Sequence, residues 1–457
     1  MKLTGNILTI IMLASLLGCS LHQVQDEIDP PAFTPQSFSQ SGEVTAPDRW
    51  WEAFNDVELN RLIDKTLVDN RDLRAAFSRL KQFYALAAPS GTMPQASAGL
   101  NAARARAFPG DEAVTGNDIS LDISVSWEID LYKRLSALDA AQALEADAFR
   151  QDTEALALSL SAAVARTWYG AAAQRQVLDL LQEQLDVNGK FLDIIETRFK
   201  NGESSAVSVY QQREQMAAIE AQIPPATALL KTLEHQLAVL TGEPPKSAID
   251  ESLKILPDLP APPSTGLPSD LVRKRPDLRA AAIRITTADY RVGAALANRY
   301  PRLTLAGSTG YNAGEISDLF DNWIWNLIGG LAQPIFSAGE IAAEIDRTEA
   351  VLEEAVNLYE GALLNALLEV EDALTRETYQ HQLLDRLQKQ LDLAESALDS
   401  GQARYLEGVG DFLTVLTEIQ ATQRIQRSLI IEKNNLIGHR IALYQALGGD
   451  WTAALNP

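Results

Sequence analysis

Polar and apolar residues alternate without a break from Asp118 to Leu131. The apolar positions are Ile119, Leu121, Ile123, Val125, Trp127, Ile129 and Leu131, and every residue between them is polar. This period of two predicts a β-strand with two unlike faces. The segment is longer than an ordinary soluble strand of five or six residues and is typical of a strand that crosses a membrane. A long amphipathic hairpin in a soluble protein is the alternative.

A second segment, 323–336, repeats the pattern less strictly, and its Trp323 and Trp325 are typical of a membrane interface. We expect a weaker strand before each of the two segments, at about 94–106 and 301–311. Four strands cannot close a barrel, and lipid does not tolerate an open sheet edge. Several copies of the chain must therefore share one barrel. Two copies would give 8 strands and three would give 12, and the pattern does not choose between them.

Two long stretches without proline predict helices far above the usual length of 11 or 12 residues. Both are rich in Ala, Leu, Glu, Gln and Arg, which favour helices. One helix is expected over about 137–201 and the other over about 340–400. A helix of the first length would span about 100 Å. Such helices need a special setting, such as a coiled coil or the wall of a tube.

Each long helix is followed by a glycine turn, at Gly202 and at Gly408. A returning helix is expected after each turn, over about 207–240 and 412–447, so the chain forms two antiparallel helical hairpins. Pro224-Pro225 lies inside the first returning helix and should kink or break it.

The two halves of the chain match each other at a nearly constant offset. The segment Asn70-Arg71-Asp72-Leu73-Arg74-Ala75-Ala76 corresponds to Arg275-Pro276-Asp277-Leu278-Arg279-Ala280-Ala281. Arg198, Gly202 and Gly242 correspond to Arg404, Gly408 and Gly448. The repeat is too long for a solenoid unit and indicates a duplicated half. We expect the first repeat over 48–243, a proline-rich connector over 244–268, the second repeat over 269–451 and a short tail over 452–457.

The N-terminus resembles an export signal. Lys2 precedes a short apolar stretch, which ends just before Gly18 and Cys19, the only cysteine of the chain. This arrangement is typical of a secretory signal peptide, here over 1–18. Cys19 directly after it resembles a bacterial lipobox, in which the cysteine carries acyl chains. An ordinary signal peptide with a buried thiol is the alternative. Ser20 in place of an aspartate indicates the outer membrane, and 19–47 is expected to be a lipidated tether.

Composition narrows the classes of function. The chain has 39 Lys and Arg against 61 Asp and Glu, a net charge of -22. This charge argues against a nucleic-acid partner, because phosphate binding needs a basic surface. The acidity fits either solubility or a lumen that favours cations. The sequence has no phosphate loop, nucleophile elbow or Cys/His metal spacing. We therefore expect no enzyme activity, no catalytic residue, no cofactor and no metal site.

Several short motifs follow one another along the mature chain. They are Trp50-Trp51-Glu52-Ala53-Phe54, Arg275-Pro276-Asp277-Leu278-Arg279-Ala280-Ala281, Val292-Gly293-Ala294-Ala295, Leu303-Thr304-Leu305-Ala306-Gly307, Pro334-Ile335-Phe336-Ser337-Ala338-Gly339 and Asp411-Phe412-Leu413-Thr414-Val415-Leu416. In this order they resemble the TolC-like outer membrane factors, specifically their lipoprotein branch.

The resemblance implies a mainly α-helical fold with a transmembrane β-barrel contribution. It implies a homotrimer, with a 12-stranded barrel in outer-membrane lipid and an α-barrel tunnel in the periplasm. The implied partners are a periplasmic adaptor protein, which grips the helical tips, and an inner-membrane efflux pump. The implied function is the passive exit duct of a tripartite efflux or export system, anchored through Cys19. The alternatives are a structural lipoprotein scaffold that does not conduct and a porin without partners, and the long helices speak against a porin.

The resemblance also indicates where the tunnel closes. In this family the closure lies near the second tip and often contains rings of carboxylates. Thr414 and Thr417 stand where a carboxylate is often found, and Asp411 and Glu418 flank them. The constriction is therefore expected to be less acidic or displaced. Gly202 and Gly408 map onto the turns that adaptors contact, where glycine would either permit a close approach or simply cap a helix.

Overall fold

The computed structural model describes five stretches of the chain. The predicted signal peptide and Cys19 lie outside them, as does part of the predicted connector. The described stretches are 22–25, 28–88, 91–107, 114–245 and 256–455.

The chain separates into two compact units, each assembled from distant stretches of sequence. The first unit contains Leu80–Arg150 and Ala280–Glu360, together with the described residues up to Asp29. The second unit contains Pro30–Arg79, Gln151–Arg279 and Gly361–Pro457. Each unit thus takes matching parts from both halves of the duplicated sequence.

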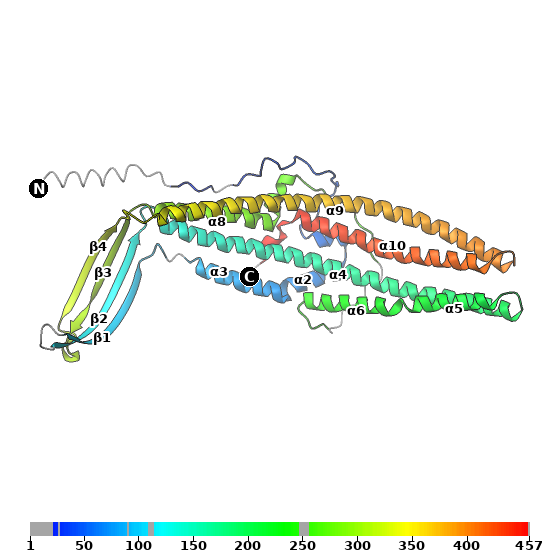
Figure 1. Cartoon of the computed structure of the whole chain (residues 1–457), viewed down its shortest axis with the longest axis horizontal. Coiled ribbons are helices and arrows are strands. Elements are labelled where there is room, and N and C mark those ends of the chain that lie inside the picture. Colours follow the sequence, from blue (N-terminus) through cyan, green and yellow to red (C-terminus); the bar gives the residue numbers. More distant parts are fainter. Residues whose placement is uncertain (1–21, 26–27, 89–90, 108–113, 246–255, 456–457) are drawn as a thin grey trace. The chain divides into compact units, whose positions relative to one another are not determined.

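A four-stranded antiparallel sheet lies in the first unit, with the strands in the order β1-β2-β3-β4 (Figure 1). Each half of the chain supplies one hairpin, as predicted, and β2 and β3 join the hairpins. β1 and β4 are the edge strands, whose outer backbone groups pair with no described strand. The strands are β1 (Gln95–Ala107), β2 (Val114–Ile129), β3 (Arg302–Ala313) and β4 (Trp323–Ala332).

The register of the sheet gathers apolar residues on one face. Leu121 of β2 pairs with Leu100 and with Tyr311, and Tyr311 pairs in turn with Trp323. The opposite face is polar along β1, β2 and β3. It carries Ser97, Asn101, Ser120, Asp122, Ser124, Ser308 and Asn312. The predicted two-faced sheet is therefore confirmed, and the register shows that its apolar face extends across all four strands.

Two strand ends differ from the sequence pattern for local reasons. β2 ends at Ile129, because the carboxylate of Asp130 accepts the backbone N–H groups of Leu135 (3.0 Å) and Ser136 (2.6 Å) and turns the chain into the next helix. β4 ends at Ala332 rather than at 336, since Pro334 has no N–H group to continue a ladder.

The long helices are present as predicted, and two of them contain 67 residues each. The first returning helix is broken between Glu220 and Ile223, and the two prolines occupy the first turn of the second piece, where no N–H donor is needed. The helices are α4 (Arg134–Lys200), α5 (Ala206–Glu220), α6 (Ile223–Leu240), α9 (Glu340–Leu406) and α10 (Phe412–Leu447).

The helix α9 continues about six residues beyond the predicted end. Gly401 does not interrupt it, and a Cβ at that position would lie 3.9 Å from Val415 of α10, an ordinary contact. None of the described helices combines the length and the apolar composition that a membrane span requires. The other α-helices of the described residues are α2 (Val57–Asp69), α3 (Arg71–Leu86), α7 (Leu271–Lys274) and α8 (Pro276–Ala297).

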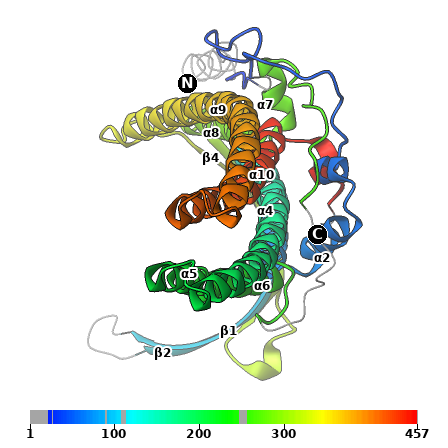
Figure 2. The same cartoon turned by 90° about the vertical axis from the view of Figure 1, so that its right-hand side faces the viewer.

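In the second unit, α9, α10, α4 and the α5/α6 pair are neighbours in one curved row (Figure 2). The main apolar core includes Ala165 and Trp168 of α4, Ile441 of α10 and Leu237 of α6. Alanine at many core positions of α4 lets the neighbouring backbones approach closely. The core therefore lies where α4 meets the returning helices of both halves.

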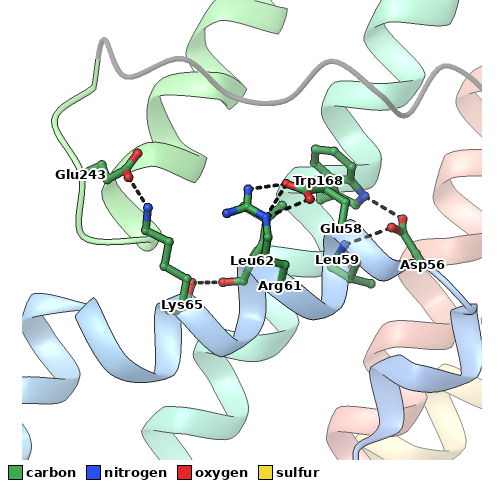
Figure 3. A network of polar contacts seen from close by, with 9 residues as sticks. Asp56, Glu58, Leu59, Arg61, Leu62, Lys65, Trp168 and Glu243 are labelled. Atoms are coloured by element: carbon green, nitrogen blue, oxygen red, sulfur yellow. Dashed lines mark hydrogen bonds and ion pairs between the residues drawn. The ribbon is translucent and has the colours of Figure 1, made fainter.

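A polar network attaches α2 to this row (Figure 3). The carboxylate of Asp56 accepts the backbone N–H of Leu59 (3.0 Å) and so caps α2, and it also accepts the indole N–H of Trp168 (2.8 Å). At the other end of α2, Lys65 forms an ion pair with Glu243. The cap and the ion pair fix α2 at both ends against the rest of the second unit.

The duplication has a structural counterpart where the two returning helices end. The side chain of Asn70 donates a hydrogen bond to the carbonyl of Leu240 (2.9 Å), and Arg275 donates one to the carbonyl of Ala446 (3.1 Å). Both donors stand at the start of the matching seven-residue motifs. Each motif thus binds the last turn of the returning helix of its own half.

The predicted tether and connector contact each other in the second unit. The backbone N–H of Gly42 donates to the carbonyl of Pro263 (3.0 Å), and the N–H of Ser264 donates to the carbonyl of Val44 (2.7 Å). The end of the predicted tether is therefore fixed to the connector by main-chain hydrogen bonds.

Candidate partner-binding and gating site at the helical tips

The turn between α4 and α5 closes with a two-bond cap. The N–H of Gly202 donates to the carbonyl of Phe199 (3.0 Å), and the N–H of Glu203 donates to the carbonyl of Arg198 (2.8 Å). Gly202 has φ +80°, in the left-handed region that favours glycine. This arrangement is the Schellman motif, which satisfies the last carbonyls of a helix.

The turn between α9 and α10 repeats this cap. The N–H groups of Gly408 and Val409 donate to the carbonyls of Tyr405 (3.1 Å) and Arg404 (3.0 Å), and Gly408 has φ +77°. A Cβ at Gly202 would have no neighbour within 4 Å, so backbone conformation rather than crowding requires glycine there. Within this chain, both glycines act as helix caps.

Arg198 links the two tips. Nη1 of Arg198, in the last turn of α4, donates to the carbonyl of Leu406 in the last turn of α9 (3.1 Å). Its guanidinium carbon lies 5.0 Å from the centroid of the Tyr405 ring, which is the geometry of a cation–π contact. Sequence comparison of the halves singled out Arg198 as a repeated position but did not reveal this contact. A repeat identifies equivalent positions and does not show that a side chain of one half contacts the other half.

A compact apolar cluster, here called the tip core, lies beneath the two turns and holds four helices together. Tyr405 and Phe412 stand on either side of the second turn, with ring centroids 5.8 Å apart, and Phe191 of α4 lies 6.2 Å from both rings. The tips of both hairpins therefore form one packed body. The tip core consists of Phe191, Ile195, Val209, Tyr405, Phe412, Val415, Leu416 and Ile419.

The predicted gate residues lie at the start of α10. Asp411 precedes the helix and is exposed, and its side chain makes no capping hydrogen bond. Thr414 and Thr417 are exposed, whereas Glu418 is half-buried. The hydroxyl of Thr417 donates to the carbonyl of Leu413 (2.8 Å), which leaves its methyl group and both lone pairs of its oxygen for other contacts. The structure thus brings the four residues together on the first two turns of one helix.

A buried layer of amides, here called the glutamine layer, lies farther from the tips. Gln212 of α5 donates to the backbone carbonyl of Asn188 of α4 (2.9 Å), and Gln215 donates to the side chain of Gln423 of α10 (3.1 Å). Gln184 of α4 donates to the backbone carbonyl of Gln423 (3.3 Å). All five side chains are buried. A buried polar layer of this kind fixes the register of three helices, although Oε1 of Gln212 has no hydrogen-bond partner among the described residues.

Sequence reasoning missed the glutamine layer. The available signal was glutamine at positions that share a helix face with apolar residues, such as Gln212 between Val209 and Ile219. Glutamine also favours exposed helix surfaces, so this signal alone does not distinguish a buried layer from a solvated face. Within the described ranges, no group of three or more His, Cys, Asp or Glu side chains could hold a metal ion.

Comparisons with known proteins agree with this architecture. The family described as outer membrane efflux protein matches the chain twice, over residues 62–243 and 267–449. The chain is 31% identical over 421 residues to the pyoverdine export outer membrane protein OpmQ of Pseudomonas aeruginosa, covering 88% of this chain and 87% of that protein. It is 30% identical over 482 residues to the toluene efflux pump outer membrane protein TtgF of Pseudomonas putida, covering 97% and 96%.

Among solved structures, the chain is similar to the outer-membrane channel OprN. The TM-score is 0.85 at 26% sequence identity, and the match covers 93% of this chain and 99% of that one. The two family matches fall one in each half of the chain.

Proposed function

The chain belongs to the outer membrane efflux protein family, and on this premise we propose that it is the outer-membrane exit duct of an efflux or export system. In this role it passively conducts small molecules from the periplasm to the exterior, while an inner-membrane pump supplies the energy. The observation that carries the proposal is the sheet with one apolar and one polar face. Such a sheet suits a barrel wall between lipid and an aqueous lumen.

The proposal requires several copies, because one chain leaves both edge strands unpaired. We propose a homotrimer with a 12-stranded barrel, in which β4 of one copy pairs with β1 of the next. Ile335 and Phe336, just beyond β4, support an interface there. Their side chains are 96% and 88% exposed in the single chain, and such adjacent apolar groups are expected to be covered in an assembly.

The tips are the proposed contact site for a periplasmic adaptor protein. The turns at Gly202 and Gly408 present backbone and the exposed side chains of Glu203 and Glu407, and the tip core makes them rigid enough to be recognised as one surface. We propose that Asp411, Thr414, Thr417 and Glu418 belong to the gate of the tunnel. The adaptor and the pump would then open the gate by binding the exposed surface of the tips.

The proposed location is the bacterial outer membrane, with a lipid anchor at Cys19 and the helical tunnel in the periplasm. The names of the two relatives refer to pyoverdine and toluene. A passive duct need not recognise either kind of compound, and we propose that the pump selects the substrate.

The experiment is to extract the protein from isolated outer membranes with detergent and to measure its oligomeric mass. A trimer in the outer-membrane fraction is expected for the wild type. The Cys19→Ala variant tests the anchor separately, and we expect it to lose lipid labelling. A soluble monomer in the periplasm would contradict the duct. A trimer that fails to release small solutes from liposomes would instead favour the non-conducting scaffold.

A further inference from the structure

The polar face of β2 carries three carboxylates, and two of them have partners. Asp118 accepts a hydrogen bond from the amide of Asn312 on β3 (2.7 Å). Glu128 forms an ion pair with Arg134 at the start of α4 (2.8 Å). Among the described residues, the carboxylate of Asp122 has neither a hydrogen-bond partner nor an ion-pair partner. Its charge is therefore available to whatever fills the space above the polar face.

Asp122 stands between two glycines, Gly99 on β1 and Gly310 on β3. A Cβ at Gly99 would lie 3.3 Å from Oδ1 of Asp122. A Cβ at Gly310 would lie 2.2 Å from the carbonyl oxygen of Leu121 and 3.0 Å from the Cβ of Asp122. The two positions directly opposite Asp122 therefore carry no side chain, although Nδ2 of Asn101 on β1 would lie 3.6 Å from a Cβ at Gly99. The close fit at Gly310 excludes alanine without a shift of the backbone.

No nearby cation neutralises this carboxylate. Within the four described strands, Arg302 is the only basic residue on the polar face, and it lies at the far end of β3. Arg302 stands eight positions from Gly310, the partner of Asp122, which corresponds to about 26 Å along a strand. This distance exceeds the screening length of about 8 Å at physiological salt. The field around Asp122 is therefore set by its own charge.

We propose that Asp122 determines the charge selectivity of the barrel lumen. This inference rests on the proposed function: three copies around a shared barrel place three half-buried carboxylates without ion-pair partners at one level of its polar lining. Rings of Asp or Glu attract cations and repel anions in other channels. The barrel would then favour cationic small molecules over anionic ones, whichever pump delivers them.

The test uses the purified full-length protein in planar bilayers, inserted in one known orientation. A trivalent cation, hexaamminecobalt(III), is added first to the sheet side and then to the tip side. Block is measured from each side separately, because the total conductance is dominated by the narrowest part of the duct and would not report on the barrel alone. For Asp122→Asn we expect block from the sheet side to need about tenfold more cobalt complex at low salt. Block from the tip side should stay unchanged.

Two variants separate charge from structure. Asp122→Glu keeps the charge and should retain wild-type block from the sheet side. Asp72→Asn removes the same charge from an exposed position on α3, outside the sheet, and should change neither block. The proposal is overturned if Asp122→Asn forms trimers and is blocked from the sheet side like the wild type, or if Asp122→Glu loses block to the same extent. A wild-type protein that forms no conducting pore would instead contradict the proposed function itself.

Discussion

The guanidinium of Arg440 on α10 forms a two-bond ion pair with the carboxylate of Glu377 on α9, and both side chains are buried. Nε of Arg440 lies 2.9 Å from Oε2 of Glu377, and Nη1 donates to the backbone carbonyl of Pro260 (2.8 Å). Arg440 is 0% exposed and Glu377 is 5% exposed. Burial alone would lower the pKa of Arg440, but the carboxylate holds that pKa above its usual value. The pair thus ties the connector between the repeats to both helices of the second hairpin.

Removing one partner of this pair should be costly. Glu377→Ala leaves a buried cation without its counter-charge, and we expect a loss of about 3–5 kcal/mol of stability. Asp372→Ala is the matched control, since Asp372 pairs with Arg376 at a half-exposed site of the same helix and should cost about 0–1 kcal/mol. Thermal unfolding of the purified protein measures both. Equal melting temperatures for the two variants would show that the buried pair contributes nothing special.

The sequence predicted the elements better than their contacts. The alternation from Asp118 to Leu131 sufficed to assign β2 and its two faces, because burial of one face and solvation of the other follow directly from a period of two. The break at Pro224 was equally direct, since proline lacks the N–H group that a helix interior needs. These predictions depend only on neighbours along the chain.

Contacts between segments that are distant in the sequence could not be predicted in the same way. Arg440 and Glu377 are 63 residues apart on helices full of charged residues, and nothing local marks them as buried. The same holds for Arg198, which reaches Leu406 across 208 positions. At the candidate site, the sequence located both turns and the start of α10, but the structure was needed to find the tip core and the glutamine layer.

A glycine series separates backbone strain from crowding. Gly202 and Gly242 have nearly the same φ, +80° and +78°, but a Cβ at Gly242 would lie 2.4 Å from the carbonyl oxygen of Asp69. Gly202→Ala should therefore cost only about 1–2 kcal/mol, the penalty of a left-handed residue. Gly242→Ala should cost clearly more, because the chain must also move away from Asp69. Thermal unfolding of the two variants shows which of them loses more stability.

The control for this series is Gly361→Ala, in the interior of α9. A Cβ at that position has open space, and alanine favours a helix, so we expect a gain of about 0.5–1 kcal/mol. If Gly202→Ala destabilised as strongly as Gly242→Ala, the open space at the first tip would be disproved and a second contact there would be required.

Phe336 provides a test of the proposed trimer that does not depend on transport. Its side chain is 88% exposed in the single chain, so Phe336→Ala should leave the fold of each copy intact. If a neighbouring copy covers the ring, the variant should weaken the assembly by about 1.5–3 kcal/mol per interface. Trimer dissociation on heating in detergent measures this. Val57→Ala, at a position that is 83% exposed on α2, is the control. Identical dissociation of both variants would exclude Phe336 from the interface.

Loss of the contact between Arg198 and the second tip is expected to change gating. Arg198→Ala removes the hydrogen bond to the carbonyl of Leu406 and the cation–π contact with Tyr405. A hydrogen bond from a charged donor contributes about 1.5–3 kcal/mol, so separation of the tips should become at least about tenfold more frequent. We expect a higher open probability in planar bilayers. Arg213→Ala, which removes an exposed ion pair between α4 and α5, should leave the open probability unchanged.

Tyr405→Phe distinguishes the ring of Tyr405 from its hydroxyl group. The hydroxyl makes only a long contact of 3.4 Å with Ser204, whereas the ring supports both the tip core and the guanidinium of Arg198. The phenylalanine variant should therefore gate like the wild type. If it opened as readily as Arg198→Ala, the hydroxyl would hold the tips together and the role assigned to the arginine would be wrong. If Arg198→Ala gated like the wild type, the tip core alone would keep the two turns closed.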